Sequence, residues 1–234
     1  MQLSFQLYIM KIFDFIFYLV FTINLFFGSS FINLNSSDKD KLLLEIIAYV
    51  IDKGHYNPKQ MDDDFSKNVF DAYIEALDGQ HRFFLKTDIN NFNNFKTKID
   101  DQLKSSNIDF FNLTFDQAEI RKEQVKDFYP SLLKEPFDFS IEESTSLNFK
   151  ETPYAKNLSE LKERWRKRFK LSTLDRFVTK KEQEIIKKDK NPNYIIKSDE
   201  VLEKESRMLT HQNIDDFFQM IDDMERKDYF SFFI

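Results

Sequence analysis

Apolar residues recur every three or four positions along most of this sequence, which is the spacing that places side chains on one face of an α-helix. The pattern predicts helices over residues 38–54, 62–77, 88–104, 115–133, 158–177, 180–190, 198–210 and 214–233. It breaks down between residues 135 and 154, where Pro136 and Pro153 favour an extended backbone. We therefore predict a mainly α fold, a multi-helix domain with a short irregular or two-stranded extended segment near residues 135–155.

The stretch of residues 69–89 organises this prediction. It begins as an amphipathic helix with one apolar face, formed by Val69, Phe70, Tyr73, Ile74 and Leu77. Asp78 and Gly79 should end that helix, because glycine tolerates the left-handed conformation that a helix C-terminus commonly needs. Residues 83–85 form a short apolar anchor, and Thr87 and Asp88 offer the N-cap of the next helix.

Three further helices have a predicted apolar face. For the first, Ser36, Ser37 and Asp38 are candidate N-caps, the helix ends at Gly54, and the face is Leu43, Ile46, Ile47, Val50 and Ile51. For the helix of residues 88–104 the face is Ile89, Phe92, Phe95, Ile99 and Leu103. For the helix of residues 158–177 it is Leu158, Leu161, Trp165, Phe169 and Leu174. We expect these faces to form the core.

Residues 1–30 are predicted to lie outside the folded domain. Lys11 precedes an apolar run at residues 15–27, and small residues follow it. A positive residue, an apolar stretch and small residues in this order are typical of a secretory signal peptide. An uncleaved inner-membrane anchor through residues 12–27 is the alternative, although the run is short of the about 20 residues that span a bilayer.

Both interpretations of the N-terminus predict an exported protein. The folded part would be periplasmic, or anchored in the inner membrane and facing the periplasm. Met1 and Met10 are both candidates for the first residue of the protein, because Met10 is also a conventional beginning for a signal sequence.

Composition narrows the classes of function. The chain has 234 residues, of which 41% are hydrophobic, enough for one sizeable domain or two small ones. Only three glycines are present, which favours long helices, and a net charge of −6 argues against a general nucleic-acid binder. The absence of cysteine excludes disulfides, thiolate metal sites and a cysteine nucleophile.

A basic cluster surrounds Trp165 in the helix of residues 158–177. Its members are Lys162, Arg164, Arg166, Lys167, Arg168 and Lys170. Such a cluster with an aromatic residue invites a nucleic-acid interpretation, but Trp165 lies on the apolar stripe and acidic residues interrupt the cluster. We prefer a core tryptophan with a solvated basic face, some of whose arginines dock a partner domain by bidentate pairs with carboxylates.

The acidic run of residues 62–64 falls in the first turn of a helix, where carboxylates oppose the helix dipole, and it lacks the alternating ligands of an EF-hand. His55, His81 and His211 lack metal-ligand spacing. His81 follows Asp78 closely, and we prefer a turn held by side-chain hydrogen bonds over a catalytic Asp–His pair. We predict no catalytic, cofactor-binding or metal-binding residues and no cofactor in this chain.

Three stretches together resemble one family, the tail-specific proteases, which are carboxy-terminal-processing serine peptidases of the bacterial periplasm. They are ALDGQHRFFLKTDINNF (residues 76–92), LKERWRKRFKLSTLDRF (residues 161–177) and DDFFQMIDDMERKDYFSFFI (residues 215–234). The similarity spans residues 38–234, the helical N-terminal domain of that family, in the compositional style of a Bacteroidetes-like member. Gly79 departs from the family pattern, which usually has proline there.

The resemblance implies a function for the whole protein rather than for this chain alone. In the family, a substrate-binding PDZ domain and a Ser-Lys protease domain follow this region, and we expect that they are missing here, as in a fragment or a split-gene product. The chain would then be a non-catalytic platform that supports substrate capture, with the PDZ and protease domains, protein substrates or an adaptor lipoprotein as partners and no nucleic acid. The alternative is a free-standing exported helical adaptor that binds a protein partner.

Overall fold

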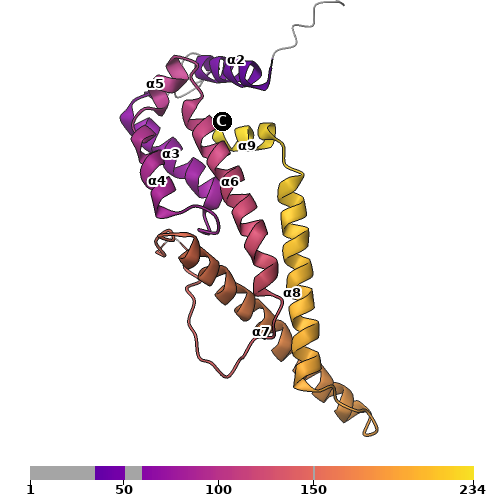
Figure 1. The fold of residues 1–234 in the computed structure, drawn as a ribbon. Helices are drawn as coiled ribbons and strands as arrows, with labels where there is room; N and C mark the ends of the chain where they lie inside the picture. The colour runs from indigo at the N-terminus through magenta and orange to yellow at the C-terminus, as the bar shows by residue number, and fades with distance from the viewer. Residues whose placement is uncertain (1–34, 51–59, 150) are drawn as a thin grey trace, which may run out of the picture. The chain divides into compact units, whose positions relative to one another are not determined.

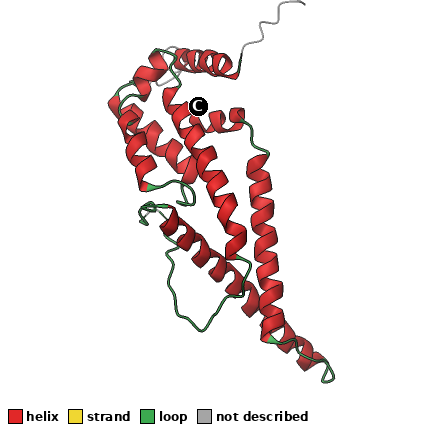
Figure 2. Cartoon of the chain, in the orientation of Figure 1, coloured by secondary structure: helices red, strands yellow, loops and turns green. Residues whose placement is uncertain are grey.

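The computed structural model describes residues 35–50, 60–149 and 151–234. The chain divides into two units, residues 1–39 and 40–234, and the boundary falls within the first described helix. The described residues form helices and loops without a sheet, as Figure 1 and Figure 2 show. The predicted mainly α fold is therefore confirmed.

The helices have the following bounds: α2 Ser36–Tyr49, α3 Asp63–Asp78, α4 Lys86–Phe92, the short 3-10 helix η2 Asn93–Phe95, α5 Ile99–Lys104, α6 Asp109–Leu132, α7 Leu158–Lys190, α8 Asp199–Asp222 and α9 Arg226–Phe233.

One hydrophobic core gathers around α3. Its predicted face is confirmed, because Phe70, Tyr73 and Ile74 are buried. They pack with aromatic residues of α6 and α9; the ring centroids of Tyr73 and Phe233, for example, are 5.1 Å apart. The acidic run also behaves as predicted, since the Asp62 side chain accepts hydrogen bonds from the first turn of α3 as its N-cap.

A second core surrounds α7. It contains Leu161, Trp165 and Phe169 of the predicted apolar face, together with Ile214 and Phe218 of α8. Leu158, also predicted to face inward, is instead 37% exposed at the N-terminus of α7.

Two predicted helix breaks were wrong. The sequence predicts one break between residues 177 and 180 and another between 210 and 214, but α7 and α8 run through both. Residues 178–179 and 212–213 are exposed, so the helices continue there without apolar residues at the expected spacing. The two helices pack through polar as well as apolar side chains, since Thr173 of α7 and Thr210 of α8 are buried and lie 3.1 Å apart, Oγ1 to Oγ1.

The prediction of one continuous helix over residues 88–104 was also wrong. It is broken into α4, η2 and α5, although Phe92, Ile99 and Leu103 are buried as expected. The break follows the asparagine-rich run NNFNNF at residues 90–95. Asparagine competes with the helical backbone for hydrogen bonds, which accounts for the tightened turn.

Helix α2 buries a different face from the predicted one. Leu43, Ile46 and Val50 are about half exposed, whereas Leu44 and Asp40 are buried. Asp40 accounts for this rotation, because its carboxylate pairs with Arg226 of α9 at 3.0 Å. The N-cap is Asn35, whose side chain accepts from the Asp38 backbone N–H. Gly54, the predicted helix end, and Ile51 lie outside the described residues.

The described residues of segment 135–155 contain no strand pair, so the irregular alternative is the one observed. A parallel bridge joins Leu85 to Ala155, and there the Lys86 N–H donates to the Ala155 carbonyl at 2.8 Å. In the part of the chain that the structure describes, no helix is both long and apolar enough to cross a bilayer. The predicted signal peptide or anchor lies outside that part, as does His55.

Candidate functional site

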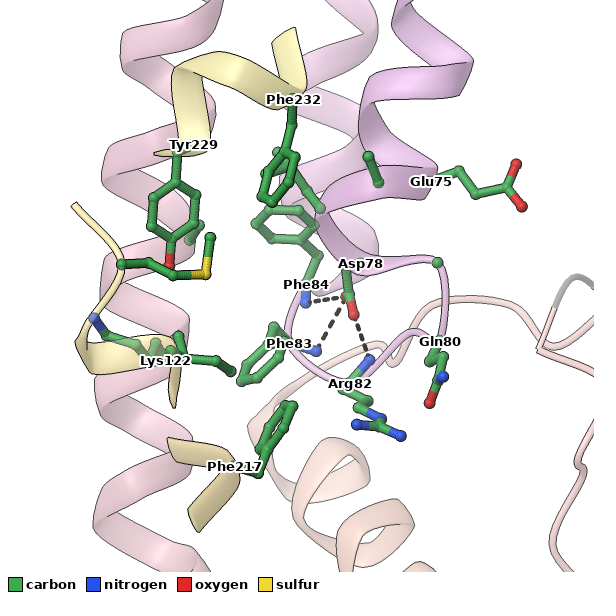
Figure 3. A pocket seen from close by; sticks show the side chains of 16 residues that line it. Glu75, Asp78, Gln80, Arg82, Phe83, Phe84, Lys122, Phe217, Tyr229 and Phe232 are labelled. Atoms are coloured by element: carbon green, nitrogen blue, oxygen red, sulfur yellow. Dashed lines mark hydrogen bonds between the residues drawn. The ribbon is translucent and has the colours of Figure 1, made fainter. Parts of the chain in front are cut away.

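The turn that joins α3 to α4 is built around one carboxylate. Asp78, the last residue of α3, is 4% exposed and accepts three backbone hydrogen bonds, from Arg82 at 2.7 Å, Phe83 at 3.0 Å and Phe84 at 2.8 Å (Figure 3). The predicted turn held by side-chain hydrogen bonds is thus observed. Because the backbone wraps around a single side chain, the position of residues 82–84 depends on Asp78.

Burial raises the pKa of Asp78 to about 6. Removal from water disfavours the charged form, and this outweighs the three N–H donors that favour it. The carboxyl group therefore titrates close to the pH of ordinary buffers.

Gly79 is required for a reason different from the predicted one. Its φ is −60°, so it is not left-handed; His81 adopts φ of 49° instead. A Cβ on residue 79 would lie 2.6 Å from the Glu75 carbonyl oxygen, a distance that real Cβ atoms do not reach. The glycine is therefore needed for space and not for a left-handed conformation.

His81 ties the turn to the extended segment. Its Nδ1 lies 2.6 Å from the Thr152 carbonyl oxygen, and its ring centroid lies 3.7 Å from that of Tyr154. Its contact with Asp78 runs through the backbone, His81 N–H to the Asp78 carbonyl, and so the two residues do not form a side-chain Asp–His pair. His81 acts here as a structural connector.

The start of α4 also differs from the prediction. Leu85 is the N-cap residue, and Asp88 reaches back from the third helical position to accept from the Leu85 N–H at 2.7 Å. Thr87 makes no cap. Arg121 of α6 binds both oxygens of Asp88 at 2.8 Å, a bidentate pair that joins the turn to α6 and that the sequence alone did not reveal.

Trp165 is buried, as expected, and its indole Nε1 donates to the Arg82 carbonyl at 2.8 Å. The basic residues around it are not a solvated face, because most bind the chain itself. Arg164 pairs with Glu160, Arg166 pairs with Glu143 and Glu163, and Lys170 pairs with Glu143 at 2.6 Å. These cations anchor the extended segment to α7.

A pocket of about 360 Å³ opens beside the turn. Figure 3 shows Phe83 and Phe217 at one end and Tyr229 and Phe232 of α9 at the other. Arg82 lies on its edge, with the guanidinium carbon 5.3 Å from the centre of the Phe217 ring. The pocket is lined mainly by apolar residues and is open to solvent on one side, so it suits a side chain of a bound protein.

Within the described residues, no group of three or more histidine, aspartate or glutamate side chains is arranged to hold a metal ion. His81 and His211 lie in different parts of the fold, in the turn and in α8.

The fold and the site together define a helical domain organised around an aspartate-held turn and an adjacent apolar pocket. A family model described as the tail specific protease N-terminal domain matches residues 47–234, which is most of the chain. The chain therefore belongs to the family of tail-specific protease N-terminal domains.

A curated relative is similar over part of this region. The tail-specific protease of Haemophilus influenzae is 32% identical over 102 residues. That match covers 43% of this chain and 15% of the relative, so the chain spans a small part of the length of that protein.

Proposed function

We propose that this chain is the non-catalytic N-terminal platform of a periplasmic tail-specific protease. In such a protein, a PDZ domain and a Ser-Lys protease domain would capture and hydrolyse protein substrates near their C-termini, with the lysine as base for the serine nucleophile. The platform would support substrate capture by presenting a rigid surface to those domains or to the substrate.

The observation that carries this proposal is the rigid turn of residues 78–88 beside an open apolar pocket. Asp78 fixes the backbone of residues 82–84, Arg121 clamps Asp88, and Trp165 binds the Arg82 carbonyl. A surface fixed from three sides is suited to docking, because little ordering entropy remains to be lost on binding. The family match supports the protease context.

A chimera tests the proposal. This chain would be joined in frame to the portion of the Haemophilus influenzae protease that follows its own N-terminal domain, and cleavage of a reporter protein with an apolar C-terminus would be measured. We expect this chain alone to be inert and the chimera to cleave at least tenfold faster than the protease portion without an N-terminal domain. Hydrolysis by this chain alone, or a chimera no faster than the bare portion, contradicts the proposal.

Export is tested separately. Residues 1–30 fused to an alkaline phosphatase that lacks its own signal should give phosphatase activity in the periplasm, because that enzyme needs the oxidising compartment to fold. The size of the fusion product then separates a cleaved signal peptide from an uncleaved anchor through residues 12–27. An inactive cytoplasmic fusion contradicts export.

A further inference from the structure

Arg82 and Arg168 are half-buried arginines, and neither forms an ion pair with any residue that the structure describes. Arg168 donates to the Gln80 carbonyl at 2.6 Å, and its guanidinium carbon lies 4.9 Å from the Phe149 ring centre. The Arg82 guanidinium lies against the Phe217 ring. Arg164 and Arg166, on the same helix as Arg168, each pair with a glutamate.

Both arginines adjoin the turn of residues 78–88, and the charge of Arg82 acts on Arg168. Arg168 binds the carbonyl of Gln80, and the Arg82 carbonyl binds the indole of Trp165, three residues before Arg168. Burial and the positive charge of Arg82 lower the pKa of Arg168 to about 10, and burial lowers the pKa of Arg82. The nearest carboxylate, Asp78, is already occupied by three backbone N–H groups. An added carboxylate would therefore be strongly favoured here.

The pocket that Arg82 lines supplies the apolar half of a binding site. Its walls include Phe83, Phe217 and Phe232, and the last is 46% exposed at the rim. Lys122 also lines it, but Lys122 is neutralised by Glu119 at 2.8 Å and Asp222 at 3.5 Å. The unpaired positive charge is therefore confined to the edge formed by Arg82.

We propose that the pocket and the two arginines bind an acidic segment of a protein, with an apolar side chain in the pocket and an aspartate or glutamate carboxylate between Arg82 and Arg168. This inference rests on the proposed platform function and names the chemistry of what docks on it. Aromatic residues beside an arginine are typical of the central anchors of protein interfaces. A phosphate site would draw on free backbone N–H groups, and those of residues 82–84 are held by Asp78.

The single tryptophan of the chain reports on this site directly, because Trp165 contacts the Arg82 carbonyl and lies 6.0 Å from the Arg168 guanidinium carbon. The full chain would be titrated with three hexapeptides, each acetylated at its N-terminus and amidated at its C-terminus. The first contains phenylalanine and glutamate, the second phenylalanine and glutamine, and the third serine and glutamate. Sodium phosphate is the fourth titrant. We expect saturable fluorescence change with the phenylalanine–glutamate peptide and at least tenfold weaker binding of the other three.

Variants assign the binding to the named residues. Arg82→Gln and Arg168→Gln should each weaken the phenylalanine–glutamate peptide at least tenfold, whereas Arg166→Gln, which removes a guanidinium already paired with Glu143 and Glu163, should change it less than twofold. Phe232→Ala leaves the turn intact and should weaken binding several-fold, so the proposal stays testable if an arginine variant unfolds. Circular dichroism establishes which variants are folded.

The proposal is overturned if the glutamine peptide binds as tightly as the glutamate peptide, if phosphate or the serine peptide binds equally well, if no peptide binds, or if the folded Arg168→Gln variant binds like wild type. Its failure is distinguishable from that of the platform function. If the chimera cleaves but the peptides do not bind, only the docking chemistry is contradicted. If the peptides bind but the chimera is inactive, only the protease role is contradicted.

Discussion

Two buried carboxylates close loops at different places in this domain, and their pKa values move in opposite directions. Asp78 holds the turn after α3 with three backbone N–H donors, and burial raises its pKa to about 6. Glu184 holds the connection between α7 and α8 by accepting from the Tyr194 hydroxyl, the Lys197 N–H and the Lys187 ammonium, and its pKa falls to about 2.

Both residues are under 5% exposed, but the largest cause of the pKa shift differs: it is burial for Asp78 and the hydrogen bond from Lys187 for Glu184. A side-chain ammonium adjoins Glu184 at 2.8 Å, and its hydrogen bond is the largest cause of the lowered pKa. Asp78 has no such partner among the residues described, because the arginine nearest in sequence, Arg82, turns its guanidinium toward Phe217. A carboxylate that receives only backbone dipoles remains poorly compensated.

The largest loss of stability should come from Asp78→Ala, which removes one of the two carboxylates compared. It leaves three backbone N–H groups of a buried turn without an acceptor, and we expect a loss of about 3 to 5 kcal/mol in the free energy of unfolding. Urea unfolding monitored by circular dichroism measures it, and Asp78→Asn, which keeps one acceptor oxygen, should lose less. Equal stability of wild type and Asp78→Ala would show that the turn does not depend on this carboxylate.

The pH dependence of stability should reveal the raised pKa of Asp78. The folded pKa of about 6 lies above the ordinary aspartate value of 3.8, so the folded state binds the extra proton. The stabilising contribution of that proton is complete below pH 3.8 and is lost as the pH rises through 6. The shift corresponds to about 3 kcal/mol. The unfolding free energy of wild type minus that of Asp78→Asn should therefore be larger at pH 4 than at pH 7, and a flat difference contradicts the assignment.

A smaller effect is expected from Gly79→Ala. The added Cβ would meet the Glu75 carbonyl oxygen at 2.6 Å, and since that oxygen belongs to the α3 backbone the chain must shift. We expect a loss of about 1 to 3 kcal/mol, seen as a lower midpoint of thermal unfolding. An unchanged midpoint would mean that the end of α3 yields without cost.

Glu184→Gln should give the smallest change and the opposite pH dependence. The lowered pKa means that the contribution of the Glu184 carboxylate is complete above the ordinary glutamate value of 4.5 and is lost as the pH falls toward 2. The stability difference between wild type and this variant should therefore grow as the pH rises from 2 to 5. The Lys187 side chain is 52% exposed, so solvent screens the pair and limits the effect.

The sequence was informative where burial and apolar character coincide. The faces of α3 and of the first half of α7 follow from regular spacing of large apolar residues, and Phe70, Tyr73 and Trp165 are buried as predicted. It misleads where a continuing helix is exposed to solvent, as at residues 178–179 and 212–213, or where one ion pair sets the rotation of a helix, as Asp40 and Arg226 do for α2.

The candidate site was harder to predict than the fold. The sequence predicts the turn from Asp78 and its neighbours. It attributes Gly79 to a left-handed backbone angle, whereas the structure shows that a Cβ there would contact the Glu75 carbonyl oxygen. Arg82 and Arg168 are 86 residues apart, and no local pattern predicts that both adjoin one turn. Arg164 and Arg166 each have a glutamate three or four residues earlier in α7, whereas Arg168 contacts Gln80 and Phe149, which only the folded chain places beside it.

The turn of residues 78–88 also determines the order in which this chain is expected to fold. Its Asp78 hydrogen bonds span only four to six residues and close quickly, whereas its bonds to Thr152, Trp165 and Arg168 span 71, 83 and 88 residues. Closing such long loops carries a larger entropy loss and slows folding. We expect α3, the turn and α4 to be structured in the folding transition state and α7 to dock afterwards, so that mutations at Asp78 slow folding while mutations at Trp165 mainly accelerate unfolding.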